Sequence, residues 1–411
     1  MDQSDVIIVG AGAAGLSLAH RLAGADGPGA PPAVTLVDAL DQALRPPERT
    51  WCFWEEGDGE FEDAVTASWR RLRVVGRDGT GSVHRPAPYR YKMIRSTAFR
   101  ELVERRLARH AGVRTVHADV DTVRDVRGGA EVSGTAEGGR RVTLRARWVF
   151  DSRPPRDLPR ARSTLLQHFR GWFLRTDAPV FDPDVALLMD FRTPQPRHGV
   201  SFGYVLPTGP DEALVEYTEF SPAPLTRDAY ERRLRHYTRE VLRLGSVQVH
   251  GCEQGVIPMT DAVFPRRVGR SVFRIGTAGG ATRPATGYTF AAIQRQCRAI
   301  AAACRRGAVP VPPAPYSARA RAMDAVLLRL LLRERVDGAR FFTGLFENTP
   351  TARLLRFLDG GTRLWEDIAI GLRTPVLPML RTACEVPLLP RRDRPARPAP
   401  VSAADRRAVR S

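Results

Sequence analysis

One apolar run of this chain passes directly into a glycine-rich turn, and this junction restricts the possible folds more than any other feature. Residues 5–9 read DVIIV, a β-branched run typical of a strand that is buried on both faces. Residues 10–15, GAGAAG, follow at once and open an amphipathic helix. Such a junction directs free backbone N–H groups and the positive end of a helix dipole at one point, which suits a pyrophosphate. Gly10 permits the turn, Gly12 lets a phosphate approach the backbone, and Gly15 lets the helix pack close to the strand.

A carboxylate follows the next apolar run at the expected distance. Residues 34–37 are apolar or β-branched and end in Asp38, twenty-three residues after Gly15. In dinucleotide-binding units the second strand places an acidic residue there, where it binds ribose hydroxyls. The pattern predicts an α/β protein with a Rossmann-like dinucleotide-binding domain. The glycines alone do not separate FAD from NAD, although a position this early in the chain is typical of flavoproteins that bind FAD.

A second strand followed by glycines lies far along the sequence. Residues 271–276 form an apolar run, and the loop after it leads into another helix. Its candidate cofactor-binding residues are Gly276, Gly279, Thr286 and Gly287. We predict that this junction approaches the same cofactor from its other end, and an ordinary glycine-rich turn is the alternative.

The length of 411 residues, 43% of them hydrophobic, allows two domains or one domain with a large insertion. Residues 165–257 alternate in hydrophobicity and are rich in aromatic side chains, which predicts an antiparallel sheet. Residues 65–75 alternate well enough for a further strand. We therefore assign 1–60, 85–160 and 265–308 to a discontinuous FAD-binding domain, 61–84 and 161–264 to an inserted substrate domain, and 309–390 to a helical C-terminal segment. We expect residues 391–411, rich in Arg, Pro and Ala, to be disordered.

The net charge is +18, and Lys92 is the only lysine, so nearly all the positive charge is arginine. The arginines are spread along the chain without an aromatic-rich basic patch, which argues against nucleic acid as a partner. Their charge favours an anionic membrane surface. No run of about twenty residues is continuously apolar. We expect a cytoplasmic protein, peripheral on the inner face of the cell membrane. The five cysteines have no metal-ligand spacing, so no metal is expected.

Two apolar segments leave alternatives open. Residues 51–54 contain two tryptophans and a phenylalanine, which indicates either packing between domains or a wall against an apolar ligand. In the predicted helix at 323–335, the apolar side chains of Val326, Leu327, Leu330 and Leu331 share one face. That face either packs on the main body or lies on a membrane surface.

Several stretches together resemble the flavoprotein lycopene cyclases of bacteria and plants. The N-terminal stretch is shared with many flavoproteins, whereas RTWCFWE, EQGVIPM and GGATRPATGY are more specific to this family. The similar stretches, within residues 5–290, are DVIIVGAGAAGLSLAHRL, RTWCFWE (49–55), YRYKMIRS (89–96), VFDSRP (149–154), QHFRGWFLRT (167–176), LVEYTEFS (214–221), EQGVIPM (253–259) and GTAGGATRPATGY (276–288).

This resemblance implies the fold of flavin-dependent aromatic hydroxylases and geranylgeranyl reductases. It also implies the reaction, which is cyclisation of the linear ends of lycopene to β-ionone rings, through γ-carotene to β-carotene. The implied cofactor is reduced FAD, with NAD(P)H as the electron donor, although substrate and product are isomers.

An isomerisation that begins by protonating an alkene requires an acid. The family's glutamate motif matches LVEYTE, which makes Glu216 the candidate catalytic residue. Where plant members have a second acidic residue directly after this glutamate, the chain has Tyr217, and Glu219 comes later. Three residues apart on a strand, Glu216 and Glu219 should face opposite sides. An apolar pocket could raise the pKa of Glu216 well above about 4.3. Whether Glu216 or the flavin delivers the proton stays open.

Two other functions are compatible with the sequence. A flavin monooxygenase or prenyl reductase of the same fold would consume NAD(P)H and change the mass of its substrate. The presence of Thr277, where related hydroxylases usually have aspartate, argues slightly against the hydroxylase. A carotenoid-binding flavoprotein without activity would bind the polyene and form no product.

Overall fold

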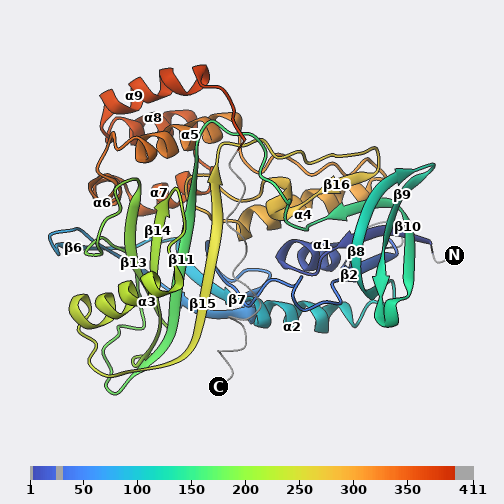
Figure 1. Ribbon diagram of the computed structural model, residues 1–411, viewed down its shortest axis with the longest axis horizontal. Helices are drawn as coiled ribbons and strands as arrows, with labels where there is room; N and C mark the ends of the chain where they lie inside the picture. Colours follow the sequence, from blue (N-terminus) through green and yellow to red (C-terminus); the bar gives the residue numbers. More distant parts are fainter. Residues whose placement is uncertain (1–2, 25–30, 394–411) are drawn as a thin grey trace.

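The computed structural model describes residues 3–24 and 31–393, and these residues form two large sheets with helices on their faces (Figure 1). The first sheet contains a parallel array in the order β8, β2, β1, β10, β16, and β9 pairs antiparallel with both β8 and β10. Its strands are β1 (Gln3–Val9), β2 (Val34–Asp38), β8 (Val113–Val126), β9 (Gly129–Ala136), β10 (Arg141–Asp151) and β16 (Val272–Arg274). The predicted Rossmann-like arrangement is confirmed.

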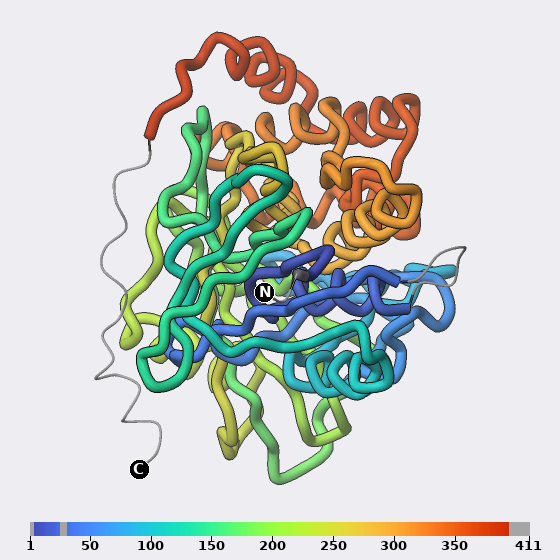
Figure 2. The backbone as a smooth tube through the Cα atoms, turned by 90° about the vertical axis from the view of Figure 1, so that its right-hand side faces the viewer, coloured from blue at the N-terminus to red at the C-terminus, as the bar shows by residue number. Residues whose placement is uncertain are grey.

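The two faces of this sheet are covered differently. Helices α1 (Ala13–Ala23), α2 (Ser96–Leu107) and α4 (Phe290–Arg305) pack on one face and bury an apolar core there. The strands β8, β9 and β10 extend beyond the parallel array and fold over the other face, where their side chains bury a second, smaller core. Figure 2 shows this domain, in blue and teal, from the end of the molecule. Burial on both faces explains why residues 6–9 are uniformly apolar.

The second sheet has the order β15, β11, β14, β13, β12, β5, β6, and all neighbouring strands except β12 and β5 are antiparallel. Its strands are β5 (Arg71–Val75), β6 (Gly81–His84), β11 (Thr164–Thr176), β12 (Val185–Asp190), β13 (Val200–Pro207), β14 (Glu212–Ser221) and β15 (Val247–Thr260). Helix α3 (Arg227–His236), continued by a π-helical turn (Tyr237–Val241), packs against one face. The predicted antiparallel region is therefore part of a larger mixed sheet.

A small third sheet, in the order β3, β7, β4, adjoins both domains. Its strands are β3 (Thr50–Glu56), β4 (Val65–Trp69) and β7 (Tyr89–Arg95). The single strand expected over residues 65–75 is wrong, because β4 pairs with β7 while β5 joins the large sheet. The apolar positions are Val65, Ala67 and Trp69 in β4 but Leu72 and Val74 in β5, so the alternation changes phase at the two consecutive arginines where the chain changes sheets. The division into domains stays a prediction.

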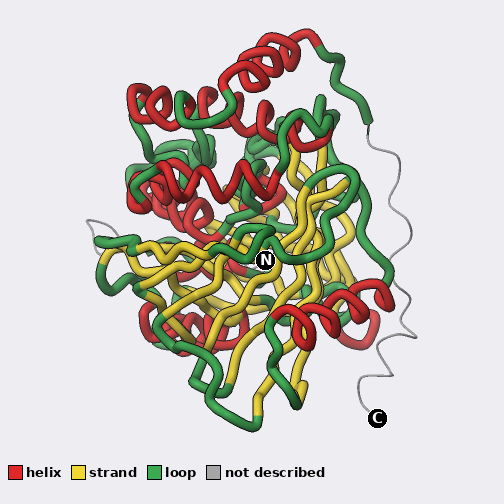
Figure 3. The backbone as a smooth tube through the Cα atoms, turned by 90° about the vertical axis from the view of Figure 1, so that its left-hand side faces the viewer, coloured by secondary structure: helices red, strands yellow, loops and turns green. Residues whose placement is uncertain are grey.

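Five helices follow in the C-terminal segment, as expected. They are α5 (Ala318–Leu332), α6 (Gly338–Asn348), α7 (Thr351–Leu358), α8 (Leu364–Gly371) and α9 (Val376–Glu385). Helices α5, α6 and α7 cover the free face of the large sheet, and Figure 3 shows the helical segment above the strands. Of the apolar side chains on α5, Val326, Leu330 and Leu331 are buried, so this face packs on the main body and is not a membrane-surface face.

Disorder was predicted from residue 391 onward, and the start of this predicted tail is wrong. Arg392 exchanges two backbone hydrogen bonds with Ala161, at 2.8 and 3.0 Å, so the chain is still attached to the body at residue 392. Residues 394–411, on which the rest of that expectation falls, lie outside the described residues.

Candidate active site

The first glycine junction lies between β1 and α1 and has the geometry predicted from the sequence. Gly10 has a φ of +95°, in the region that glycine tolerates best. A Cβ on Gly15 would lie 1.8 Å from the carbonyl oxygen of Gly10, so only glycine allows the helix to pack this close. A Cβ on Gly12, in contrast, would meet nothing within 4 Å.

Gly12 is also the N-cap of α1, and no side chain accepts a hydrogen bond from the first turn of the helix. Its backbone N–H groups and the positive end of the helix dipole therefore face open space. These features fit the pyrophosphate of a dinucleotide, because no side chain competes for the N–H groups.

The predicted carboxylate and the second glycine junction lie at the same edge of the sheet. Asp38 is the last residue of β2, buried, with Arg100 and Arg45 within 3.3 and 3.4 Å of its Oδ2. Gly276 follows β16 with a φ of +63°, and a Cβ there would lie 2.8 Å from the Cβ of Ala14 in α1. Parallel strands end at one edge, so Asp38 and the two glycine turns are brought near one another.

A cavity of about 380 Å³ extends from these turns to the large sheet. Ala13 of α1 lines one end of it, together with Thr277 and Thr282, and Phe342, Phe346 and Leu358 of the C-terminal helices line another part. The walls are mostly apolar or aromatic side chains, as is usual for a pocket that takes a flat or hydrocarbon ligand.

Of the four cofactor-binding residues predicted at the second glycine junction, two line this cavity and two do not. Thr286 and Gly287 line the cavity. Gly287 has a φ of +72°, and a Cβ there would lie 2.0 Å from Gln167 Oε1. That oxygen is buried and has no hydrogen-bond partner, so it can accept a hydrogen bond from an N–H of a bound ring system. Gly276 and Gly279 form a 3-10 turn (Gly276–Gly279).

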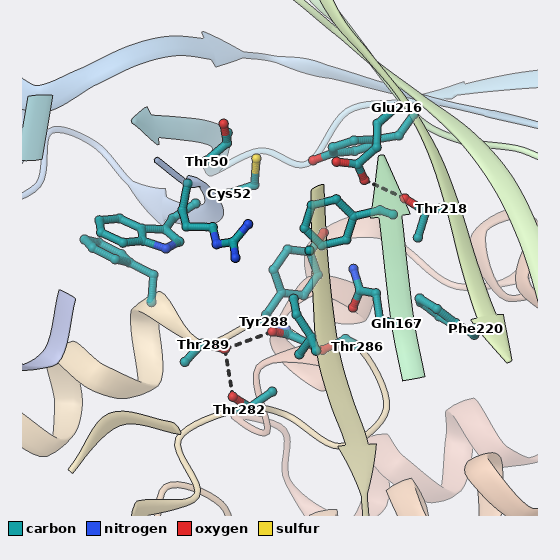
Figure 4. A pocket seen from close by; sticks show the side chains of 18 of the residues that line it. Thr50, Cys52, Gln167, Glu216, Thr218, Phe220, Thr282, Thr286, Tyr288 and Thr289 are labelled. Carbon is teal, nitrogen blue, oxygen red and sulfur yellow. Dashed lines mark hydrogen bonds between the residues drawn. The ribbon is translucent and has the colours of Figure 1, made fainter. Parts of the chain in front are cut away.

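Glu216 of β14 projects into the cavity from the side opposite Thr286 and Thr289 (Figure 4). The alternation of the strand points Leu214, Glu216, Thr218 and Phe220 the same way, and all four line the cavity. The side chain is 6% exposed, and the Thr218 hydroxyl donates a hydrogen bond to Oε1. Burial raises the pKa of Glu216 well above its ordinary value, and the charge of Glu253 raises it further; the hydrogen bond from Thr218 opposes both. This carboxyl therefore keeps its proton to a higher pH than an exposed glutamate does.

Glu219 lies on the other face of β14, as the spacing predicted. The Tyr217 hydroxyl donates a hydrogen bond of 2.9 Å to its Oε2, and His168 Nε2 is 3.7 Å from Oε1. Burial lowers the pKa of His168 to about 4, so this network carries no charged histidine at neutral pH. Glu219 is thus separated from the cavity by the sheet.

Four further polar residues of the cavity region were not singled out from the sequence. Tyr91 of β7 pairs with Tyr204 of β13 and lies 2.9 Å, hydroxyl to hydroxyl, from Tyr288. Burial raises the pKa of all three phenols, and it raises the pKa of the Cys52 thiol to about 12, so these groups are neutral. They come from four separate segments, and no local pattern links them.

Glu253 is the other carboxyl in the wall. It belongs to the EQGVIPM stretch, which carried the family resemblance but was given no chemical role.

The aromatic cluster at 51–54 serves both functions that its composition suggested. Trp51 lines the cavity and stacks on Phe290 of α4, with ring centroids 5.8 Å apart. Trp54 is edge-on to Tyr288 at 4.8 Å. Trp51 also packs against the apolar core of the first sheet and Trp54 against that of the large sheet, so the segment contacts both cores and forms part of the cavity wall.

The exposed apolar surface of the C-terminal segment lies on α8 and α9. Each of its six side chains is more than half exposed, and we call them the α8–α9 apolar surface: Leu364, Trp365, Ile368, Leu372, Leu377 and Leu380. A patch of this kind indicates an interaction surface. Among the described residues, none of the helices has the length and apolar character needed to span a bilayer.

Solved structures with this fold cover nearly the whole chain. A geranylgeranyl bacteriochlorophyll reductase-like protein from Thermoplasma acidophilum is 14% identical, with a TM-score of 0.55 over 94% of this chain and 97% of its own. The p-nitrophenol 4-monooxygenase PnpA from Pseudomonas putida is also 14% identical, with a TM-score of 0.58 over 94% and 98%. The flavin-dependent monooxygenase PieE, solved with FAD and substrate, is 14% identical, with a TM-score of 0.57 over 91% and 73%. The fold is that of the FAD-dependent aromatic hydroxylases.

The comparison with protein families gives a more specific assignment than the fold does. The profile of the family described as lycopene cyclase protein matches residues 5–384. This chain therefore belongs to the lycopene cyclase family. No curated protein sequence matches the chain.

Proposed function

We propose that this protein is a lycopene β-cyclase, which converts the linear ends of lycopene to β-ionone rings by way of γ-carotene to β-carotene. The observation that carries the proposal is a buried carboxyl group, Glu216, with a raised pKa in an apolar cavity that adjoins a dinucleotide-type glycine turn. A hydrocarbon substrate offers no polar group to bind, and the apolar walls match that chemistry.

FAD is the cofactor that the site fits best. Gly10, Gly12 and Gly15 would hold its pyrophosphate, Asp38 its ribose, and Gly276, Gly279, Thr286 and Gly287 the rest of the molecule. When bound and reduced by NAD(P)H, it would supply electron density that stabilises positive charge nearby, without net electron transfer to the carotenoid. The flavin-dependent monooxygenase PieE, which shares the fold and was solved with FAD, supports this assignment.

Glu216 begins the reaction by donating its proton to a terminal alkene carbon. Its O–H bond breaks, a C–H bond forms, and the adjacent carbon becomes a tertiary cation. A neighbouring double bond attacks that cation and closes the ring, and one C–H proton then leaves for the Glu216 carboxylate. No electron is gained or lost overall. Burial of Glu216 serves this chemistry twice, because it keeps the acid protonated and excludes water that would capture the cation.

The test is expression of the chain in a lycopene-accumulating bacterial host, followed by separation and mass analysis of the pigments. We expect a cyclic product of unchanged mass from the wild type and none from Glu216→Gln. Glu219→Gln is the matched control, because it removes a buried carboxyl from the same strand but on the opposite face. Unchanged lycopene beside flavin-loaded wild-type protein would refute the proposal, and a product of altered mass would support a monooxygenase or reductase instead.

We further propose that the protein acts as a peripheral protein on the inner face of the cell membrane. Lycopene dissolves in the bilayer, and the α8–α9 apolar surface belongs to the same helical segment that lines part of the cavity. Arginines in this region, Arg363, Arg373 and Arg381, would meet anionic headgroups. We expect flotation with anionic vesicles, lost in Leu372→Glu/Leu377→Glu and retained in Val263→Glu, an exposed site elsewhere. Equal flotation of all three proteins would place the contact on another surface.

A further inference from the structure

Glu216 and Glu253 occupy one row across the large sheet. In the pairing of β11 with β14, Gly171 is opposite Glu216; in the pairing of β11 with β15, it is opposite Glu253. Residues directly opposite one another in antiparallel strands point to the same face, so both carboxyls face the cavity with only a glycine between them. Both line it.

Because Gly171 has no side chain, none separates the two acids in this row; the space is taken by Leu214 and Glu216, since a Cβ on Gly171 would lie 2.8 Å from Leu214 Cδ1. A Cβ on Gly171 would lie 3.4 Å from Cβ and 3.6 Å from Cγ of Glu216, which places the Glu216 side chain beside the glycine that separates it from β15. Any larger residue at 171 would fill this space. The two carboxyls therefore belong to one buried site and their protonation states are linked.

The surroundings of the two acids differ in charge. Burial raises the pKa of Glu253, but the hydrogen bond of 2.7 Å from the Thr50 hydroxyl and the positive charges of Arg49 and Arg95 oppose that rise. The pKa of Glu216 is raised further, so Glu253 is the member of the pair that ionises more easily. Glu216 has the Thr218 hydroxyl and no cation. On the cavity side, Cys52, Tyr91, Tyr204 and Tyr288 are neutral. Behind the sheet, Tyr230 is neutral, Arg170 forms an ion pair with Glu231, and Glu219 accepts a hydrogen bond from Tyr217.

We propose that Glu253 is the ionised member of a buried carboxyl pair, and that its negative charge keeps the proton on Glu216. Two buried carboxylates in one site repel each other, so the acid with the arginines ionises first and the other keeps its proton. Glu253 is thus a positioning residue for the acid step, an assignment that rests on the proposed cyclase. After Glu216 has donated its proton, the charge of Glu253 favours return of a proton to Glu216, which completes the cycle without another reactant.

The test measures the protonation of Glu216 directly, in full-length protein without carotenoid. The infrared C=O stretch of a buried carboxylic acid, assigned to Glu216 by its loss in Glu216→Gln, is followed against pH. In Glu253→Gln we expect proton binding at Glu216 to weaken by about tenfold, so that the band is lost at lower pH. Glu253→Asp keeps the charge and should retain most of the wild-type behaviour.

Cyclase activity is measured in a separate experiment, so that the cyclase proposal and the carboxyl-pair proposal can be refuted independently. A shifted infrared titration without any cyclised carotenoid would refute the cyclase and leave the pair intact. An unshifted titration in folded Glu253→Gln would refute the pair, whatever the activity. If Glu253→Gln does not fold, Thr50→Val removes the hydrogen bond to Glu253 and should weaken proton binding at Glu216 in the same direction; no change there would also refute the pair.

Discussion

Substitutions of Gly15 and Gly12 in the first turn should have different effects, because Gly15 is required for packing and Gly12 for binding of the cofactor. In Gly15→Ala the new methyl group would lie 1.8 Å from the Gly10 carbonyl oxygen and 3.3 Å from Ile8 Cγ2. A backbone oxygen cannot rotate away, so α1 must move off β1. Overpacking in a core costs about 1–3 kcal/mol, and a clash with backbone places this variant at about 3 kcal/mol or above.

Gly12→Ala is the matched variant, because its methyl group meets nothing within 4 Å. Alanine is a poorer N-cap than glycine, so we expect a loss of stability of about 1 kcal/mol or less. The methyl group points into the space assigned to the pyrophosphate, and displacement of a charged hydrogen bond costs about 2 kcal/mol, close to thirtyfold in Kd.

Both variants are measured by thermal unfolding of the FAD-free protein and by fluorescence titration with FAD. Gly15→Ala should unfold at a clearly lower temperature, whereas Gly12→Ala should unfold near the wild type and bind FAD weakly. Wild-type stability of Gly15→Ala would contradict the packing argument. Wild-type FAD affinity of Gly12→Ala would show that the pyrophosphate is bound elsewhere.

Three other outcomes follow from buried polar groups. The pKa of His168, about 4, is below the 6.5 of the unfolded chain, so the stability it contributes is complete above pH 6.5 and is lost as the pH falls toward 4. This difference corresponds to about 3 kcal/mol. In His168→Phe the denaturation midpoint should therefore fall less between pH 6.5 and pH 4 than it does in the wild type, when both are measured at each pH. Lys92 is fully buried between two carboxylates. Its replacement by methionine should lower the free energy of unfolding by about 3 kcal/mol, which is measured as a lower Tm. Thr218→Val removes the hydrogen bond that lowers the pKa of Glu216, so cyclisation should persist to higher pH; an alkaline limit at lower pH would contradict that assignment.

The parts of the fold that were predicted correctly depend on local backbone requirements. Gly10 needs a positive φ and Gly15 needs close helix packing, and both needs are visible in a few consecutive residues. The opposite orientation of Glu216 and Glu219 follows from the two-residue repeat of a strand. The single strand predicted over residues 65–75 was wrong, because the alternation changes phase between β4 and β5 and the two strands pair with partners that are distant in the sequence.

The sequence by itself therefore determined the dinucleotide-type turn and the Rossmann-like sheet, since both depend on residues that are neighbours along the chain, and the resemblance to a known family supplied the candidate acid. Only the tertiary structure decided that Glu253 shares a site with Glu216. Their strands, β14 and β15, are not adjacent, and the register of both with Gly171 on β11 brings the two carboxyls to one cavity. The tertiary structure also decided which helices of the C-terminal segment expose their apolar side chains. Its helices α5 and α8 are both apolar in sequence, and packing against the large sheet leaves only α8, with α9, facing outward.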